Sequence, residues 1–125
     1  MPKYMLLMYQ PTGPGPTPEE IAEQYPQWQR FDKEIKDAGL FLANDGLAGP
    51  DAATTVRVRD GEAQITDGPF AETKEYLAGY YLIDASDLDT ALEWAARIPS
   101  SAHGSTEVRP MWQPRTGAEW GDGGA

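Results

Sequence analysis

The side chains best suited to acid–base chemistry gather between residues 67 and 75, in the stretch Asp-Gly-Pro-Phe-Ala-Glu-Thr-Lys-Glu. Gly68 can adopt backbone dihedrals that are closed to other residues and Pro69 fixes its own φ, so together they predict a rigid turn. If that turn holds Asp67 at the mouth of an apolar cavity, the loss of water around the carboxylate makes proton transfer near neutral pH feasible. We therefore interpret Asp67 as a candidate general base.

Three neighbours of the turn are candidates for substrate binding: Phe70, Glu72 as a second carboxylate, and Lys74 as the group that orients an anionic substrate. A purely structural interpretation is equally open. Asp67 then accepts backbone hydrogen bonds within the turn, and Phe70 packs into the core. In that interpretation Lys74 forms a solvated ion pair with Glu72 or Glu75.

His103 is the single histidine of the chain and lies in the polar loop at residues 100–105. Because an imidazole exchanges protons near neutral pH, His103 is the second candidate catalytic residue. The alternative is an exposed loop histidine without a chemical role. With one histidine and no cysteine, the sequence predicts no dedicated transition-metal site, and we expect no cofactor.

Two further candidates for substrate binding lie on predicted strands. Arg109 alternates with Val108, so if Val108 faces the helices, Arg109 faces the other side of the sheet. There its guanidinium would attract a carboxylate ligand, unless it forms an ordinary salt bridge. Tyr80 would offer its hydroxyl to a ligand, or it belongs to the core or an interface.

The elements that position these side chains are six predicted strands and two predicted helices. The strands cover residues 4–9, 40–42, 54–59, 63–66, 76–83 and 106–112. The third and fourth form a hairpin, because Asp60-Gly61 is a strong two-residue turn signal. This order predicts an α+β fold, a ferredoxin-like split βαβ sheet with two helices on one face and an inserted β-hairpin.

Both predicted helices are amphipathic. The first is capped by Thr17 and ends at Gly39, with a kink or a new start expected near Pro26. The second is capped by Ser86. The apolar stripes expected to dock on the sheet are Ile21, Tyr25, Trp28, Phe31 and Ile35 in the first helix, and Leu88, Ala91, Leu92, Ala95 and Ile98 in the second.

The strands at 4–9 and 76–83 are apolar on both faces, so the sheet face without helices must also be shielded from water. We therefore predict a homodimer whose two sheets enclose an apolar space that can hold a small-molecule ligand.

Length and composition predict one domain, residues 1–112, followed by a flexible glycine-rich tail, residues 113–125. A formal net charge of −10 opposes direct binding to nucleic acid and to anionic membranes. No apolar run is long enough to span a membrane and no leader is evident, which indicates a cytoplasmic protein.

The Asp67-Gly68-Pro69-Phe70 stretch closely resembles the DGPF signature of the YCII-related proteins, and the resemblance spans roughly residues 3–112. It includes the opening strand, Gly79-Tyr80-Tyr81, residues 95–99 and residues 107–110. The resemblance implies the dimeric α+β barrel architecture. Some members of the family pair a histidine near the first helix with an aspartate, but residues 17–39 contain Asp32 and no histidine, so that pair does not transfer.

Two functions therefore remain open, beside a purely structural dimer whose cavity is filled by its own side chains. One is a cofactor-free small-molecule lyase or isomerase that uses acid–base chemistry in the dimer cavity. The other is a noncatalytic dimer that senses a metabolite or binds a protein, and the resemblance places it in a regulatory setting linked to extracytoplasmic-function sigma factors.

Overall fold

A computed structural model describes residues 2–112, and the predicted flexible tail at 113–125 lies outside the described residues. Short 3-10 turns, η1 and η2, lie at Pro50–Ala52 and Pro99–Ala102. The helices and strands follow in the order β1 (Lys3–Pro11), α1 (Pro18–Asp37), β2 (Phe41–Gly46), β3 (Thr54–Arg59), β4 (Glu62–Asp67), β5 (Glu75–Asp84), α2 (Leu88–Arg97) and β6 (Ser105–Pro110).

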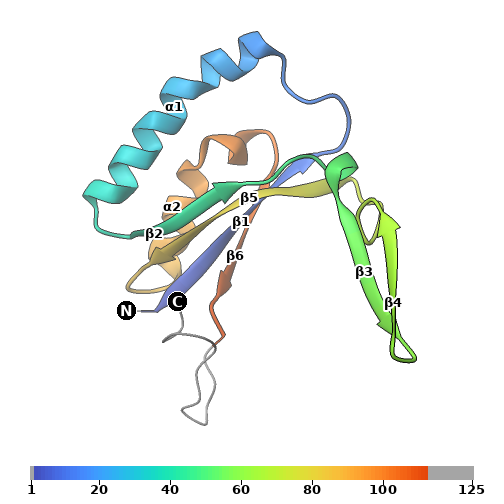
Figure 1. The fold of residues 1–125 in the computed structure, drawn as a ribbon. Coiled ribbons are helices and arrows are strands. Elements are labelled where there is room, and N and C mark those ends of the chain that lie inside the picture. Colours follow the sequence, from blue (N-terminus) through green and yellow to red (C-terminus); the bar gives the residue numbers. More distant parts are fainter. Residues whose placement is uncertain (1, 113–125) are drawn as a thin grey trace.

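Four of the strands form one antiparallel sheet in the order β2-β5-β1-β6. Both helices lie on the same side of this sheet (Figure 1). The arrangement confirms the predicted ferredoxin-like α+β fold, and β5 occupies the central position that its two apolar faces indicated.

The hydrophobic core lies between the helices and the sheet. Its largest fully buried side chains are Leu6, Ile35, Ile83 and Ile98. Each of them contributes about 1.5 to 3 kcal/mol of burial free energy. Phe31 of α1 meets Tyr81 of β5 edge to face, with ring centroids 5.2 Å apart, so an aromatic contact joins α1 to the centre of the sheet.

Helix α1 begins with a complete capping box. The Thr17 hydroxyl accepts the Glu20 backbone N–H at 3.2 Å, and the Glu20 carboxylate accepts the Thr17 N–H at 3.1 Å. The predicted start is confirmed. Of the two outcomes expected near Pro26, the new helix start is wrong, because α1 runs unbroken from Pro18 to Asp37. Pro26 and its surroundings are exposed, so water can serve the backbone carbonyl that the proline leaves without a partner.

The predicted stripe of α1 is buried only in its second half. Phe31 and Ile35 are buried and Trp28 is half-buried, whereas Ile21 and Tyr25 are 53% and 60% exposed. The reason is visible in Figure 1, where the first half of α1 stands away from the sheet. The expectation that all five side chains dock on the sheet is therefore wrong.

Helix α2 also departs from its predicted pattern. Its cap is Asp87 and not Ser86, because the Asp87 carboxylate accepts the Thr90 backbone N–H at 2.8 Å. The side chains of Leu88 and Leu92, expected in the buried stripe, are each 46% exposed. The small Ala91 and Ala95 pack on the core instead.

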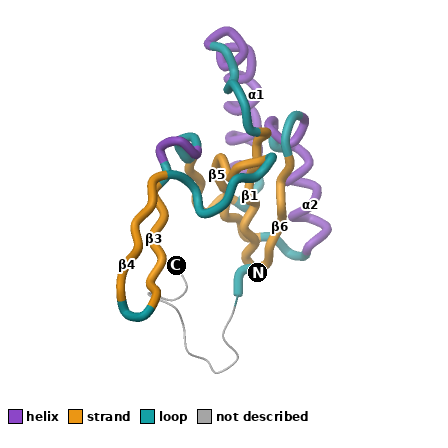
Figure 2. Tube along the Cα trace, turned by 90° about the vertical axis from the view of Figure 1, so that its right-hand side faces the viewer, coloured by secondary structure: helices purple, strands orange, loops and turns teal. Residues whose placement is uncertain are grey.

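The hairpin of β3 and β4, which we call the arm (residues 54–67), forms a separate two-stranded sheet. Asp60 and Gly61 both have positive φ, 52° and 78°, which confirms the predicted two-residue turn. Figures 1 and 2 show the arm extending away from the main sheet on the side opposite to the helices.

The sheet side without helices, which we call the open face, carries partly exposed apolar side chains. Register places Leu7 beside Tyr80 and Met5 beside Leu82 there. Val108 packs against the core on the helix side, so Arg109 lies on the open face as predicted. None of the helices in the described part of the chain has the length and apolar character of a membrane span.

Candidate functional site

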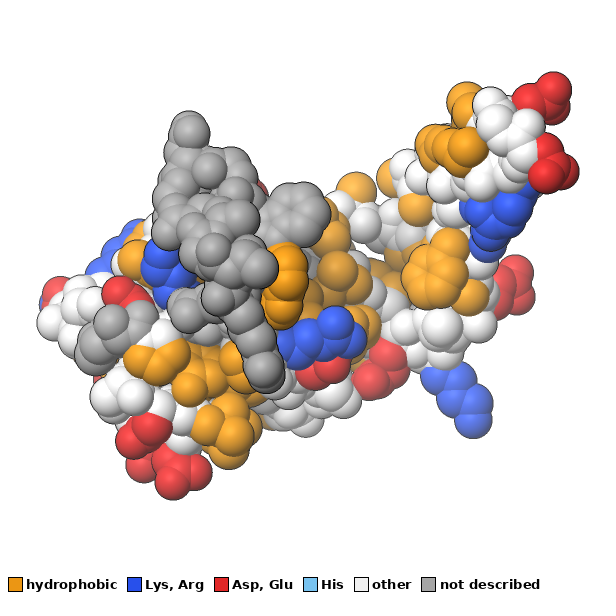
Figure 3. Space-filling view, turned by 90° about the horizontal axis from the view of Figure 1, so that it is seen from below, with side chains coloured by type: hydrophobic (Ala, Val, Ile, Leu, Met, Phe, Trp, Pro, Cys, Tyr) orange, Lys and Arg blue, Asp and Glu red, His pale blue; other side chains and the backbone are white. Residues whose placement is uncertain are grey.

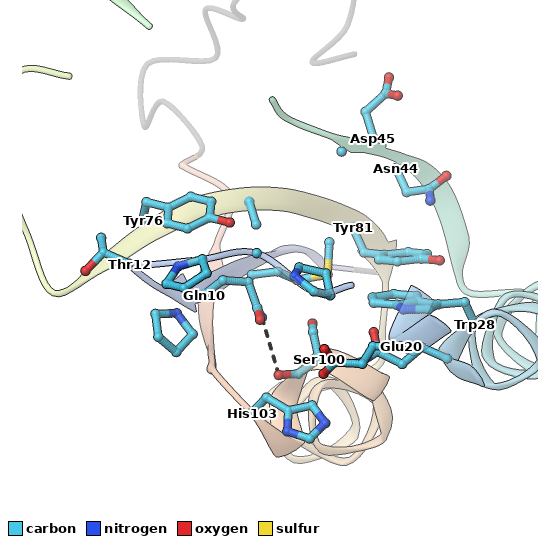
Figure 4. Close-up of a pocket in the computed structure, with 18 residues that line it drawn as sticks. Gln10, Thr12, Glu20, Trp28, Asn44, Asp45, Tyr76, Tyr81, Ser100 and His103 are labelled. Carbon is cyan, nitrogen blue, oxygen red and sulfur yellow. Dashed lines mark hydrogen bonds between the residues drawn. The ribbon is translucent and has the colours of Figure 1, made fainter. Parts of the chain in front are cut away.

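A cavity of about 680 Å³ lies between the first half of α1 and the helix side of the sheet. The end of β1, the loop at residues 12–16, the end of β2 and the loop after α2 complete its walls (Figure 4). This cavity occupies the space that opens where α1 diverges from the sheet. Its lining side chains that matter below are Glu20, Gln24, Trp28, Tyr76, Tyr81 and His103.

The wall supplied by α1 has a carboxylate, an amide and an indole in a row. Glu20, Gln24 and Trp28 are spaced by four residues, so they share one side of the helix. The capping box fixes the first of them at the helix start, and contact with the core fixes Trp28. The sequence therefore presents these three groups to the cavity from a rigid element.

The opposite wall comes from the sheet and includes Tyr81, which is 2% exposed. Its hydroxyl donates to Asp32 Oδ1 at 3.4 Å. Burial, followed by the negative charge of Asp32, raises the pKa of Tyr81 to about 12. Tyr81 thus remains a neutral hydroxyl at physiological pH, and it serves as a hydrogen-bonding group rather than as a base.

Aromatic side chains lie at both ends of the cavity. Figure 4 shows Trp28 and Tyr81 at one end and Tyr76 at the other, with His103 and Ser100 along one side. This placement leaves an elongated space with apolar ends and polar groups between them.

The ionised side chains along the cavity are acidic. Among the eighteen described residues that line it, Glu20 and Asp45 carry carboxylates and there is no lysine or arginine. The Asp45 carboxylate points away from Tyr81 (Figure 4). In the register of β2 and β5, Asp45 pairs with Tyr80, a residue of the open face. Glu20 is therefore the carboxylate that contributes charge to the cavity.

Gly79 sits where β2 approaches β5. A Cβ at this position would lie 2.7 Å from the Asp45 carbonyl oxygen and 3.1 Å from Met8 Cε. The missing side chain therefore serves the close packing of β2 against β5.

Of the residues predicted from the sequence, His103 lines the cavity, from the exposed loop that follows η2. Asp67, Phe70, Glu72 and Lys74 are exposed and lie outside the cavity wall. The structure of the described residues thus does not bring Asp67 and His103 together in one cavity. The joint catalytic role of the two residues stays a prediction.

The turn that carries Asp67 is tied to the base of the arm. Gly68 has a φ of +98° and donates its N–H to the Ala53 carbonyl at 2.7 Å, while Thr55 Oγ1 donates to the Gly68 carbonyl at 2.8 Å. Phe70 is 75% exposed, so it does not pack in the hydrophobic core. These hydrogen bonds hold the turn against the base of the arm, and the turn closes the arm.

Tyr80 and Arg109 lie on the open face, across the sheet from the cavity. Arg109 Nε donates to Glu107 Oε2 at 2.8 Å, two residues away on the same strand. This is the ordinary salt bridge that was the alternative to carboxylate binding.

The cavity wall contains groups that the sequence did not single out. Trp28 was predicted as part of the stripe that docks on the sheet, and Glu20 and Gln24 were not among the predicted site residues. Their four-residue spacing is a signal, but it becomes informative only once α1 is known to diverge from the sheet. Nothing in the sequence marks that divergence.

Comparison with known proteins bears on the whole domain. A family model described as YCII-related domain matches residues 2–115. An uncharacterized protein of Rhizobium meliloti (strain 1021) is 52% identical over 81 residues, which cover 63% of this chain and 65% of that protein. The match thus spans slightly less than two thirds of the relative.

Proposed function

The chain belongs to the YCII-related domain family, and we propose that it is a small-molecule-binding protein whose ligand occupies the cavity between α1 and the sheet. The observation that carries this proposal is the wall of the cavity, where aromatic side chains at both ends flank amide and hydroxyl groups. Apolar walls with a few placed polar groups are typical of ligand pockets.

The size of the cavity supports the same conclusion. A volume of about 680 Å³ falls inside the range of roughly 300 to 1,000 Å³ that is common for small-molecule sites. A ligand with one ring would contact Trp28 and Tyr81 at one end and leave room for polar atoms beside Gln24 and Ser100.

Charge selects among possible ligands. Glu20 supplies negative charge, the described residues of the lining include no lysine or arginine, and the chain as a whole carries −10. An anionic ligand would meet repulsion without a compensating partner, whereas an amine would meet both a carboxylate and aromatic faces. We therefore propose a neutral or cationic ligand, in place of the anionic substrate that Lys74 and Arg109 suggested.

We also propose that the protein works as a homodimer that pairs open face to open face. Support comes from an apolar patch on the side of the sheet that carries neither α1 nor α2, formed by Met5, Leu7, Tyr80 and Leu82. In such a dimer the two cavities lie on the outer sides of the paired sheets.

Acid–base catalysis in the cavity, as a lyase or isomerase, is a second candidate. His103 supports it, because this is the predicted catalytic residue that reaches the cavity wall. Sensing of a metabolite in a sigma-factor-linked setting needs binding alone, and a cytoplasmic location fits either role.

Three probes of matched size and different charge test the binding proposal: 2-phenylethylamine, 2-phenylethanol and phenylacetate. Each is titrated into ¹⁵N-labelled protein while backbone and indole N–H shifts are followed. We expect the amine and the alcohol to shift the Trp28 indole signal and the Gln24 amide signals, and phenylacetate to bind more weakly than both.

The matched variants are Trp28→Ala, which removes an aromatic wall, and Leu92→Ala, which truncates an exposed side chain on α2 away from the cavity. The first should weaken amine binding at least tenfold, and the second should leave it unchanged. Shifts that map to Arg109 and the open face instead, or tightest binding of phenylacetate, would show the proposal to be wrong.

A further inference from the structure

The arm has an apolar face that is exposed in the described part of the chain. Val56, Val58 and Ile65 are 60%, 61% and 70% exposed. Register pairs Val56 with Ile65 and Val58 with Ala63, so these side chains lie on one face of the hairpin. An isolated two-stranded hairpin is at best marginally stable in water, and this face therefore requires a partner surface.

The two faces of the arm differ sharply in chemistry. Arg57 pairs with Gln64 and Thr55 with Thr66 on the polar face, where Arg57 also donates to the Phe70 carbonyl at 3.0 Å. Figure 3 shows the hydrophobic side chains of the arm turned toward the middle of the molecule and its charged side chains at the outer edge. The apolar side chains of the arm therefore lie on the side of the molecule that also carries the open face.

The area of this side points to a second copy of the chain as its occupant. The four strands β1, β2, β5 and β6 have 9, 6, 10 and 6 residues, which gives the open face roughly 500 Å² of flat area, and the arm adds about 200 Å². A stable protein interface buries about 800 Å² on each partner, so the open face alone is small for a dimer. The arm enlarges the contact by about two fifths and brings it near that size.

Charge also favours a second copy. The chain carries −10, so two copies repel each other except where the contact is apolar or internally neutral. Arg109 on the open face is already paired with Glu107, and the inner face of the arm has Asp67 at its base as its carboxylate. Such a surface is complementary to itself, as a two-fold interface requires.

We propose that each arm packs its apolar face, Val56, Val58 and Ile65, against the other subunit of the homodimer. This contact rests on the homodimer proposed above, and it adds the apolar face of the arm to the interface. Asp67 lies on the same face of β4 as Ile65, so the partner subunit covers the turn that carries Asp67. In this arrangement the turn at residues 67–70 holds the arm in the position where it contacts the other subunit.

The first test compares Val56→Ser/Ile65→Ser with Gln64→Ser, which changes the polar face of the same strand. Sedimentation across a range of protein concentrations gives the dimer dissociation constant of each. We expect the double variant to raise this constant at least tenfold and Gln64→Ser to leave it within twofold. An unchanged constant in the double variant overturns the proposal.

A second test does not depend on how the double variant folds. The chain has no cysteine, so Ile65→Cys or Gln64→Cys provides a single attachment point for benzophenone maleimide. Illumination should join two chains when the label is at residue 65, and far less when it is at residue 64. If the protein is a dimer but the label at residue 65 crosslinks only within its own chain, the arm contact is wrong and the dimer stands. A wild-type monomer overturns the dimer as well, while binding of 2-phenylethylamine still reports on the cavity.

Discussion

Tyr81 links the cavity to an ionisation that can be measured. Burial, reinforced by the negative charge of Asp32, raises the pKa of Tyr81 from 10.0 to about 12. In the unfolded chain the hydroxyl loses its proton near pH 10, whereas in the folded chain it keeps the proton until about pH 12. The unfolded state therefore binds fewer protons in this window, and stability falls as the pH rises from 10 toward 12.

The size of the effect follows from the shift. Two pKa units correspond to about 2.7 kcal/mol over the whole window, of which about 1.4 kcal/mol is lost by pH 11. The Asp32 side chain is 35% exposed, so solvent screens its charge. Screening reduces the part of the shift that comes from Asp32, so the expected loss at pH 11 lies between about 0.7 and 1.4 kcal/mol.

Urea unfolding of the wild type and Tyr81→Phe at pH 8 and pH 11 measures this loss. Other groups titrate in both proteins, so the difference in unfolding free energy between them isolates Tyr81. We expect the wild type to lose about 0.7 to 1.4 kcal/mol more than the variant between the two pH values. Parallel losses in the two proteins would refute the assignment of a buried, proton-retaining Tyr81.

Three further changes have definite expected outcomes. Gly79→Ala should lower the unfolding free energy by about 1 to 3 kcal/mol in urea titrations, because the new Cβ would meet the Asp45 carbonyl; a neutral effect would contradict the close packing. Asp87→Ala should lower the melting temperature by a few degrees and Ser86→Ala by less, since Asp87 caps α2; the reverse order would restore the predicted cap. Glu20→Gln keeps a side chain that can complete the capping box but removes its charge. Calorimetry should therefore show the ratio of the affinities for 2-phenylethylamine and 2-phenylethanol falling about two- to fivefold. An unchanged ratio would mean that Glu20 does not select the charge of the ligand.

The fold was predictable because local signals and long-range patterns agree. Alternating residues at 54–59, the Asp60-Gly61 turn and the capping residue Thr17 act over a few positions, so they could be read from the sequence. The errors came where tertiary packing decides. Pro26 is tolerated because water reaches the backbone around it, and Ile21 remains exposed because α1 leaves the sheet.

The candidate site was predictable only in part, because a cavity depends on where elements fail to touch. His103 was found by its chemistry, since an imidazole is conspicuous in any loop. Trp28 was read as a core residue, and only the divergence of α1 turns it into a cavity wall. Asp67 was read from its turn, but whether it meets a ligand depends on where the arm lies in an assembly.

The most direct test of the central claim is a crystal structure of the protein grown with 2-phenylethylamine. We predict ligand density between α1 and the sheet, with the ring against Trp28 and Tyr81 and the ammonium toward Glu20. Density on the open face or at the arm, with the cavity empty of ligand, would contradict the proposed function.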